Sequence, residues 1–170
     1  MKILKISDDA GFMGIANFDK YRSFIAKDWD FEMIKSRIVE ETNFHHLLFW
    51  ATGLEYTWKV KIDTQASNQE SYRDIRGVIE VTSGKLHLTN YESLTRAAQF
   101  EDLKLPENHL NDLVIELENG KYMVKIRQLF NPDEFDFDAD KINFEIIPMK
   151  IERNVELYSN NVKGIYWSDY

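Results

Sequence analysis

Apolar and polar residues alternate along much of the chain, and this period of two constrains the fold more than any other feature. The clearest run is Tyr56–Asp63, where Tyr, Trp, Val and Ile alternate with Thr, Lys and Asp. Such alternation predicts a strand with one buried and one solvent-exposed face. The apolar segments Leu47–Thr52 and Asn143–Met149 predict core strands, and residues 1–9 predict a first strand. We therefore expect a mainly β protein.

One early segment has a helical period instead. Phe31, Ile34 and Ile38 recur at helical spacing, and the preceding Asp30 can cap a helix N-terminus. This pattern predicts a helix over Asp30–Thr42.

Two dipeptides, Ser83-Gly84 and Asn119-Gly120, each lie between two strand-like runs. The four runs are 75–82, 85–89, 113–118 and 121–130. Gly tolerates the positive φ that tight hairpin turns require, and Asn-Gly is the strongest short hairpin signal. We therefore predict a β-hairpin at each dipeptide.

Length and pattern together favour one globular domain over residues 1–170, because a chain of this length buries roughly 70 % of its surface on folding. The fold class predicted is a two-layer antiparallel β-sandwich, jelly-roll-like, with one N-terminal α-helix. A closed β-barrel is the alternative, and the pattern of strands does not separate the two.

The chain is acidic, with 29 Asp and Glu against 21 Lys and Arg and a formal net charge of −8. This charge disfavours nucleic-acid and anionic-membrane partners, which need a positive patch, and favours a basic protein partner. There is no Cys, and no apolar run approaches the roughly 20 residues of a membrane helix. Residues 1–9 also lack a signal-peptide core, so we expect a cytoplasmic protein.

The common catalytic motifs are missing: the chain contains no G-x-S-x-G, no phosphate-binding glycine loop and no H-E-x-x-H. The four His residues are not spaced as metal ligands, and we expect structural or surface roles for them, with His87 on the polar face of its strand. They are His45, His46, His87 and His109. We therefore predict that the protein is not an enzyme and binds neither a cofactor nor a metal.

The segment Asn131–Asp140 is the most unusual part of the chain, because it contains five carboxylates and no cation. These candidate partner-binding residues are Asp133, Glu134, Asp136, Asp138 and Asp140. The spacing of Asp136, Asp138 and Asp140 resembles the start of a calcium loop, but Lys141 and Ile147 stand where that loop needs Gly and Glu. As a strand, the segment would place Glu134 and the last three Asp on one face and Phe135 and Phe137 on the other. That stripe is either a solvated face or a docking surface for cations.

The segments Arg76–Leu88, Leu105-Pro106 and Leu117–Tyr122 together resemble the central part of the competence protein J family. Its members are small bacterial cytosolic proteins that inhibit a cognate nuclease, and small bacterial immunity proteins have a similar organisation. The resemblance implies an acidic inhibitor or immunity protein that neutralises a basic toxin or nuclease.

Two other classes of function stay open at this point. The first is a small-ligand-binding β-domain, or an enzyme, with an interior pocket lined by Trp50, Tyr56, Trp58 and Tyr122, although aliphatic neighbours favour core positions for these side chains. The second is a structural subunit of a larger assembly.

Overall fold

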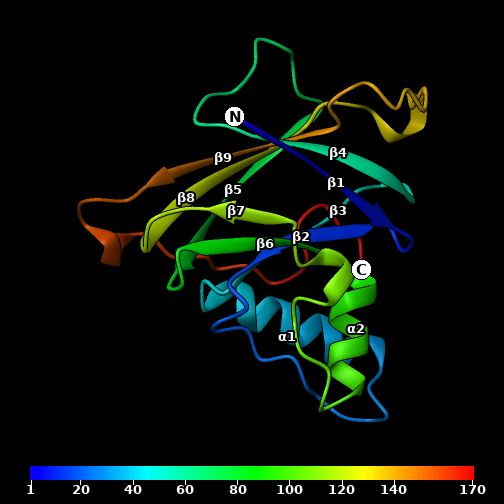
Figure 1. Cartoon of the computed structure of the whole chain (residues 1–170), viewed down its shortest axis with the longest axis vertical. Coiled ribbons are helices and arrows are strands. Elements are labelled where there is room, and N and C mark those ends of the chain that lie inside the picture. Colours follow the sequence, from blue (N-terminus) through cyan, green and yellow to red (C-terminus); the bar gives the residue numbers. More distant parts are fainter.

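Two β-sheets pack face to face, and two α-helices cover one of them, in the computed structural model, which describes residues 1–170 (Figure 1). In spatial order, the five-stranded sheet contains β1 (Lys2–Asp8), β4 (Tyr56–Ile62), β9 (Phe144–Lys150), β8 (Gly120–Gln128) and β5 (Arg73–Val81). The four-stranded sheet contains β3 (Leu47–Ala51), β2 (Phe12–Ala16), β6 (Lys85–Asn90) and β7 (Val114–Glu116). The predicted β-sandwich is confirmed, and the sheets do not close into a barrel, because each ends in two edge strands.

The two sheets enclose the main core, which contains 20 buried residues. Trp58 of β4, Trp50 of β3 and Phe144 of β9 are fully buried in it. Alternation along β4 explains the arrangement, since Trp58, Val60 and Ile62 are buried while the residues between them face outward. All strand pairs are antiparallel except that of β4 with β9, which is parallel.

The helices form a third layer against the four-stranded sheet (Figure 1). The predicted helix is present as α1 (Phe31–Asn43), and Asp30 caps it by accepting a hydrogen bond from the Met33 N–H at 2.8 Å. A second helix, α2 (Tyr91–Gln99), was not expected; Asn90 caps it, because its side chain accepts a hydrogen bond from the Ser93 N–H. Neither α-helix is long and apolar enough to span a bilayer.

Both predicted hairpins are wrong. The runs beside Ser83-Gly84 belong to different sheets, and so do the runs beside Asn119-Gly120: β5 pairs with β8, and β6 pairs with β7. The two dipeptides instead lie side by side at a corner where a long antiparallel ribbon bends from one sheet into the other. There the Gly84 N–H donates to Asn119 Oδ1 at 2.8 Å, and both glycines have positive φ.

Strand β2 was also not predicted, because glycine breaks its pattern. Gly14 has a structural reason to be there: a Cβ atom at this position would lie 2.5 Å from the Leu48 carbonyl oxygen. His87 is a further correction, since it is buried in β6 under Phe18 rather than on a polar face. Phe18 and Tyr21, in the segment that follows β2, pack over this part of the sheet.

Candidate protein-docking site

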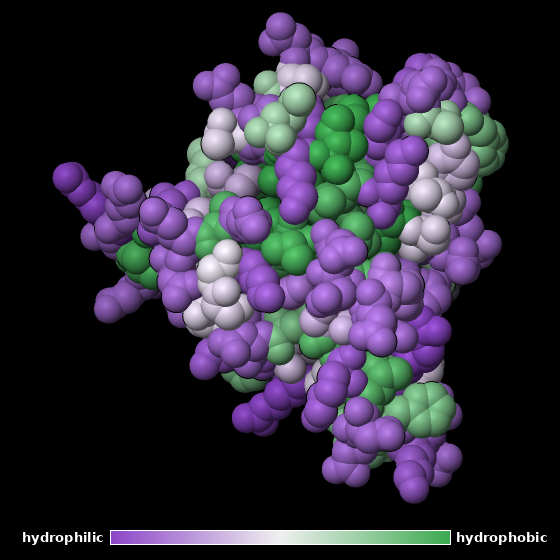
Figure 2. Space-filling view, in the orientation of Figure 1, coloured by the Kyte–Doolittle hydropathy of each residue, from purple (hydrophilic) through white to green (hydrophobic).

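The acidic segment forms a protruding loop between β8 and β9. We call residues 131–142 the acidic loop; in Figure 1 it lies at the upper right, and in Figure 2 this region is mostly hydrophilic with a hydrophobic flank. All five candidate carboxylates are exposed in it: Asp133, Glu134, Asp136, Asp138 and Asp140. A hydrogen bond from the Leu129 N–H to the Asn143 carbonyl, 2.9 Å long, closes its base.

The acidic loop is not a strand, so the predicted four-carboxylate stripe does not form. Asn131 Oδ1 accepts from the Asp133 N–H at 3.1 Å and begins the short 3-10 helix η2 (Pro132–Glu134). Further along, Asp138 Oδ1 accepts from the Asp140 N–H at 3.0 Å. These local side-chain bonds compete with sheet pairing, and Pro132 has no N–H to offer a neighbouring strand.

Lys141 compensates part of the loop's negative charge. Its ammonium pairs with Asp136 and also lies 3.8 Å from Asp138. The side-chain hydrogen bond from Lys141 lowers the pKa of Asp136, and the same bond raises the pKa of Lys141. Lys141 directly follows the five exposed carboxylates in the chain. One cation does not balance five carboxylates, so the acidic loop keeps a net negative charge.

An aromatic cluster anchors the acidic loop to the sandwich. The Phe135 ring lies 5.1 Å from that of Tyr56 and 4.7 Å from that of Phe130. Phe130 stacks on Trp58 at 4.8 Å. Phe137 packs edge-on against Tyr56 at 5.6 Å while remaining 60 % exposed, and its carbonyl accepts from the Tyr56 hydroxyl. The carboxylates are thus held on a fixed support, which limits the entropy lost on binding a partner.

The support continues into the core through Trp58. Its indole N–H donates to Asp8 Oδ2 at 2.9 Å, and the Thr52 hydroxyl donates to the same oxygen at 2.8 Å. The other oxygen of Asp8 accepts from the Phe12 N–H at 2.9 Å. Because its hydrogen bonds are satisfied, this buried carboxylate ties β1 to β2, to β4 and to Thr52, which directly follows β3.

An open hollow of about 540 Å³ lies beside the acidic loop. We call it the aromatic hollow, because Phe12, Trp167 and Tyr170 line it together with the carboxylates Glu55 and Asp169. Trp167 lies under the Arg73 guanidinium, whose carbon is 4.4 Å from the ring centre. That arrangement is a cation–π contact, and it fixes the Trp167 ring in the wall.

Gly53 joins the two features. It lines the aromatic hollow, and Pro132 of the acidic loop packs directly over it. Acidic and aromatic surface therefore form one continuous region, in which Tyr and Trp side chains can supply apolar contact and carboxylates can select a basic partner.

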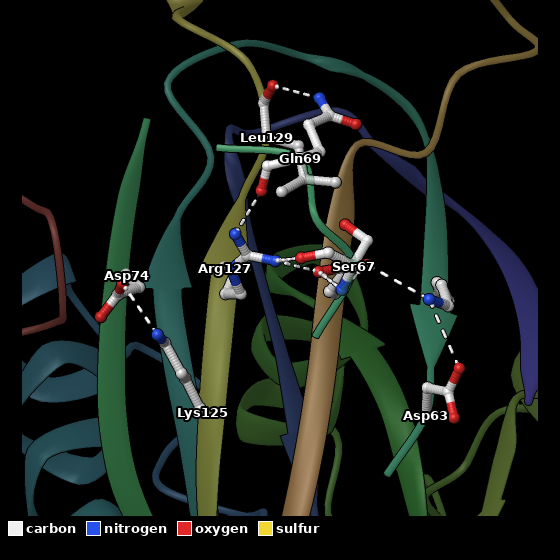
Figure 3. Close-up of polar contacts among 9 residues, drawn as sticks. Asp63, Ser67, Gln69, Asp74, Lys125, Arg127 and Leu129 are labelled. Carbon is white, nitrogen blue, oxygen red and sulfur yellow. Dashed lines mark hydrogen bonds and ion pairs between the residues drawn. The ribbon is translucent and has the colours of Figure 1, made fainter. Parts of the chain in front are cut away.

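A second dense group of polar residues has a structural role (Figure 3). Arg127 pairs with Glu145 at 2.5 Å on the outer face of the five-stranded sheet, and both side chains are buried. Arg127 also donates to the carbonyls of Ser67 and Gln69, while the Ser67 N–H donates to Glu145. The ion pair thereby fastens the loop between β4 and β5 over the sheet.

The ligand pocket that stayed open as an alternative is not formed by its four aromatic residues, and three of them occupy the core positions that their aliphatic neighbours favoured. Trp50, Trp58 and Tyr122 are buried in the core, and Tyr56 supports the acidic loop. The aromatic hollow was missed, because it combines residues 10–12, 51–55 and 167–170, which only the fold brings together. The sequence signal available was the pair of aromatic residues, Tyr166 and Trp167.

The histidines do not form a site. His46 Nδ1 lies 2.8 Å from Glu41 Oε2, His45 occupies a turn with positive φ, and His109 is exposed on the 3-10 helix η1 (Asn108–Leu110). No group of three or more His, Asp or Glu side chains is placed so that it could hold a metal ion.

No family model matches the chain, and no curated protein matches it by sequence. Two solved structures share its fold. One is ComJ from Bacillus subtilis, described as an inhibitor of the DNA-degrading activity of NucA, with a TM-score of 0.53, 11 % identity and coverage of 89 % of this chain and 96 % of that one. The other, described as crocagin biosynthetic gene J, has a TM-score of 0.57, 17 % identity and coverage of 88 % and 94 %. The fold thus resembles that of a nuclease inhibitor, in agreement with the resemblance drawn from the sequence.

Proposed function

We propose that this protein is an inhibitor that binds a basic enzyme, a nuclease or a nuclease toxin, through the acidic loop and the adjoining aromatic hollow. The observation that carries the proposal is the exposed acidic loop, fixed by aromatic packing on a fold that ComJ shares. Carboxylates held in this way can occupy the place where a nuclease binds the phosphates of its substrate.

Electrostatics gives the proposal a measurable consequence. Attraction between the acidic loop and a basic cleft accelerates association, and salt reduces this effect by shortening the Debye length from roughly 10 Å at 0.1 M to roughly 3 Å at 1 M. Exposed charges contribute little to folding stability, so their removal should leave the fold intact. Binding and folding can therefore be separated.

The experiment compares the wild type with a triple variant, Glu134→Gln, Asp136→Asn and Asp138→Asn. The candidate partners are the basic proteins encoded beside this gene, tested for nuclease activity, and the measurements are the association rate at low and high salt and the inhibition of DNA degradation. We expect the triple variant to associate more slowly at low salt, with the difference shrinking at high salt, and to melt at nearly the same temperature.

The matched control removes the same number of charges elsewhere, by Glu101→Gln, Asp102→Asn and Glu156→Gln, all exposed positions outside the acidic loop. If the control slows association as much as the triple variant does, the slower association results from the changed net charge of the protein and not from the acidic loop. If the wild type neither binds a basic protein encoded beside its gene nor inhibits a nuclease encoded there, the inhibitor function is wrong.

A further inference from the structure

The edges of the two sheets are not equally protected. At the outer edge of β5, Asn160 bonds both the N–H and the carbonyl of Val78, and the Glu80 N–H donates to the His45 carbonyl. At the outer edge of β3, the Ala51 N–H donates to the Tyr166 carbonyl. Strand β7 is only three residues long. Strand β1 differs, because its seven residues pair with β4 alone and cross the front of the molecule (Figure 1).

The register shows which main-chain groups of β1 face the open edge. Lys59 of β4 directs its carbonyl away from β1, where it accepts from the Asn143 N–H, and its own N–H donates to the Asn143 side chain. Lys5 is the residue opposite Lys59, so the N–H and carbonyl of Lys5 point away from β4. The N–H and carbonyl groups of Ile3 and Ser7 also point away from β4, because the orientation repeats every second residue along a strand. Asn90 Nδ2 confirms it by donating to the Ser7 carbonyl at 2.8 Å, the one outward group of these three residues with a protein partner.

A groove of about 450 Å³ runs along this bare edge. Lys5, Ile6 and Ser7 line one side, and His109, Leu110 and Leu113 lie across from them. The groove therefore offers unpaired main-chain donors and acceptors of β1 on one wall and the side chains of Leu110 and Leu113 on the other, with polar residues around them; free strand groups of this kind can bind an extended peptide.

The charges of the groove define the peptide further. Lys5 is exposed and lies directly opposite Lys59, and like charges in this position are unfavourable. Past Ser7 the sign changes: Asp9 and Glu92 line that end, and Arg96 there is held by Glu107 at 2.8 Å. A carboxylate beside Lys5 and a cation near Asp9 would match this pattern.

We propose that β1 binds an extended segment of a partner protein as a sixth strand, with an acidic side chain opposite Lys5. A second copy of this chain is a poorer occupant, because antiparallel pairing of β1 with itself, centred on Lys5, places the Lys5 side chains of the two copies directly opposite each other. This interaction does not depend on the acidic loop, so it can hold whether or not the protein inhibits a nuclease.

The test uses a phage-displayed library of random peptides, selected on the wild type and counter-selected on Lys5→Pro. Proline at residue 5 removes the outward N–H but none of the hydrogen bonds to β4, and edge strands accept proline. Selected peptides should contain an acidic residue and alternate in polarity. They should bind Lys5→Pro about tenfold more weakly or worse, the effect of a lost hydrogen bond added to the lost charge.

Lys5→Ala is the matched control, because it removes the charge and keeps the main chain; its binding should be intermediate. Melting temperatures verify that each variant folds, and Ile3→Pro, which removes another outward N–H, replaces Lys5→Pro if that variant does not fold. In the wild type, the bound peptide should slow hydrogen exchange at the Lys5 and Ser7 amides.

Three results would overturn the proposal. The first is equal binding of the selected peptides to wild type and Lys5→Pro, and the second is a selection that yields no peptide separating the two proteins. The third is a wild-type dimer that Lys5→Pro converts to a monomer, since the occupant of the edge would then be a second copy.

Discussion

A Cβ atom at Gly53 would lie 2.6 Å from Cγ of Pro132, and the Gly53 backbone has a φ of +87°. Both facts require glycine at this position: a side chain would collide with the acidic loop, and L-residues rarely adopt this φ. The position of the acidic loop therefore depends on Gly53, a residue that lies far earlier in the chain, in the turn between β3 and β4.

Replacing Gly53 with Ala is expected to lower the free energy of unfolding by about 2 kcal/mol, from backbone strain and overpacking together. The variant should also slow association with a nuclease partner, because the acidic loop must shift. Chemical denaturation and association kinetics measure the two effects. Gly164→Ala is the control, because its Cβ would contact nothing closer than 4.0 Å. An unchanged stability for Gly53→Ala would show that Pro132 moves away at no cost.

Trp58→Ala is expected to destabilise the protein by about 3–5 kcal/mol, since the side chain is fully buried in the core and stacks on Phe130. Trp58→Phe should cost less, as it keeps a ring but leaves Asp8 without one hydrogen bond. Urea denaturation gives both values. Tyr170→Ala, at a side chain that is 75 % exposed, should change stability little. A small effect of Trp58→Ala would contradict the packing described above.

Glu145→Gln is expected to cost about 3 kcal/mol, because it leaves the buried Arg127 guanidinium without its counter-charge. The loop between β4 and β5 should open first, which faster hydrogen exchange at the Ser67 amide would report. Asp74→Asn is the control, since it removes an exposed partner of Lys125 at 3.2 Å and should cost less than about 1 kcal/mol. Equal costs for the two variants would show that burial of the Arg127 pair is unimportant.

Glu145 also makes stability depend on pH. Burial acts to raise its pKa, but the hydrogen bonds from Ser67, Arg127 and Lys61 outweigh burial and leave the pKa below its ordinary value of 4.5. A carboxyl whose pKa is lower in the folded state stabilises the protein above the unfolded pKa and loses this contribution as pH falls through the folded pKa. We therefore expect stability to fall as the pH decreases below about 4.5, less steeply in Glu145→Gln. If wild type and Glu145→Gln lose stability with pH in the same way, Glu145 does not contribute to the pH dependence of stability.

Calcium is expected to bind no more tightly than about 10⁻³ M, because the spacing of Asp136, Asp138 and Asp140 lacks the glycine and the closing Glu of a calcium loop. Lys141 also occupies Asp136 and Asp138 with an ion pair. Calorimetric titration measures the affinity, and Asp138→Asn provides the control. Submillimolar binding that this substitution abolishes would contradict the prediction.

Several elements could be predicted from the sequence, because interactions between neighbouring residues determine them. Asp30 and the spacing of Ile34 and Ile38 predicted α1, since a cap and an amphipathic face involve neighbouring residues only. The alternation of Trp58, Val60 and Ile62 predicted β4 and its buried face for the same reason. The exposure of the acidic loop also follows locally, because a run of unpaired carboxylates is costly to bury.

Tertiary structure decided which segments meet. Gly84 and Gly120 have the positive φ that their turn signals suggested, yet their neighbouring strands pair across the corner, because strand pairing depends on burial of both sheet faces at once. The aromatic hollow and the bare edge of β1 likewise depend on which strands become neighbours. Alternation along a strand identifies its buried face, but it contains no information about its partner strand, and both proposed binding surfaces follow from that choice of partner.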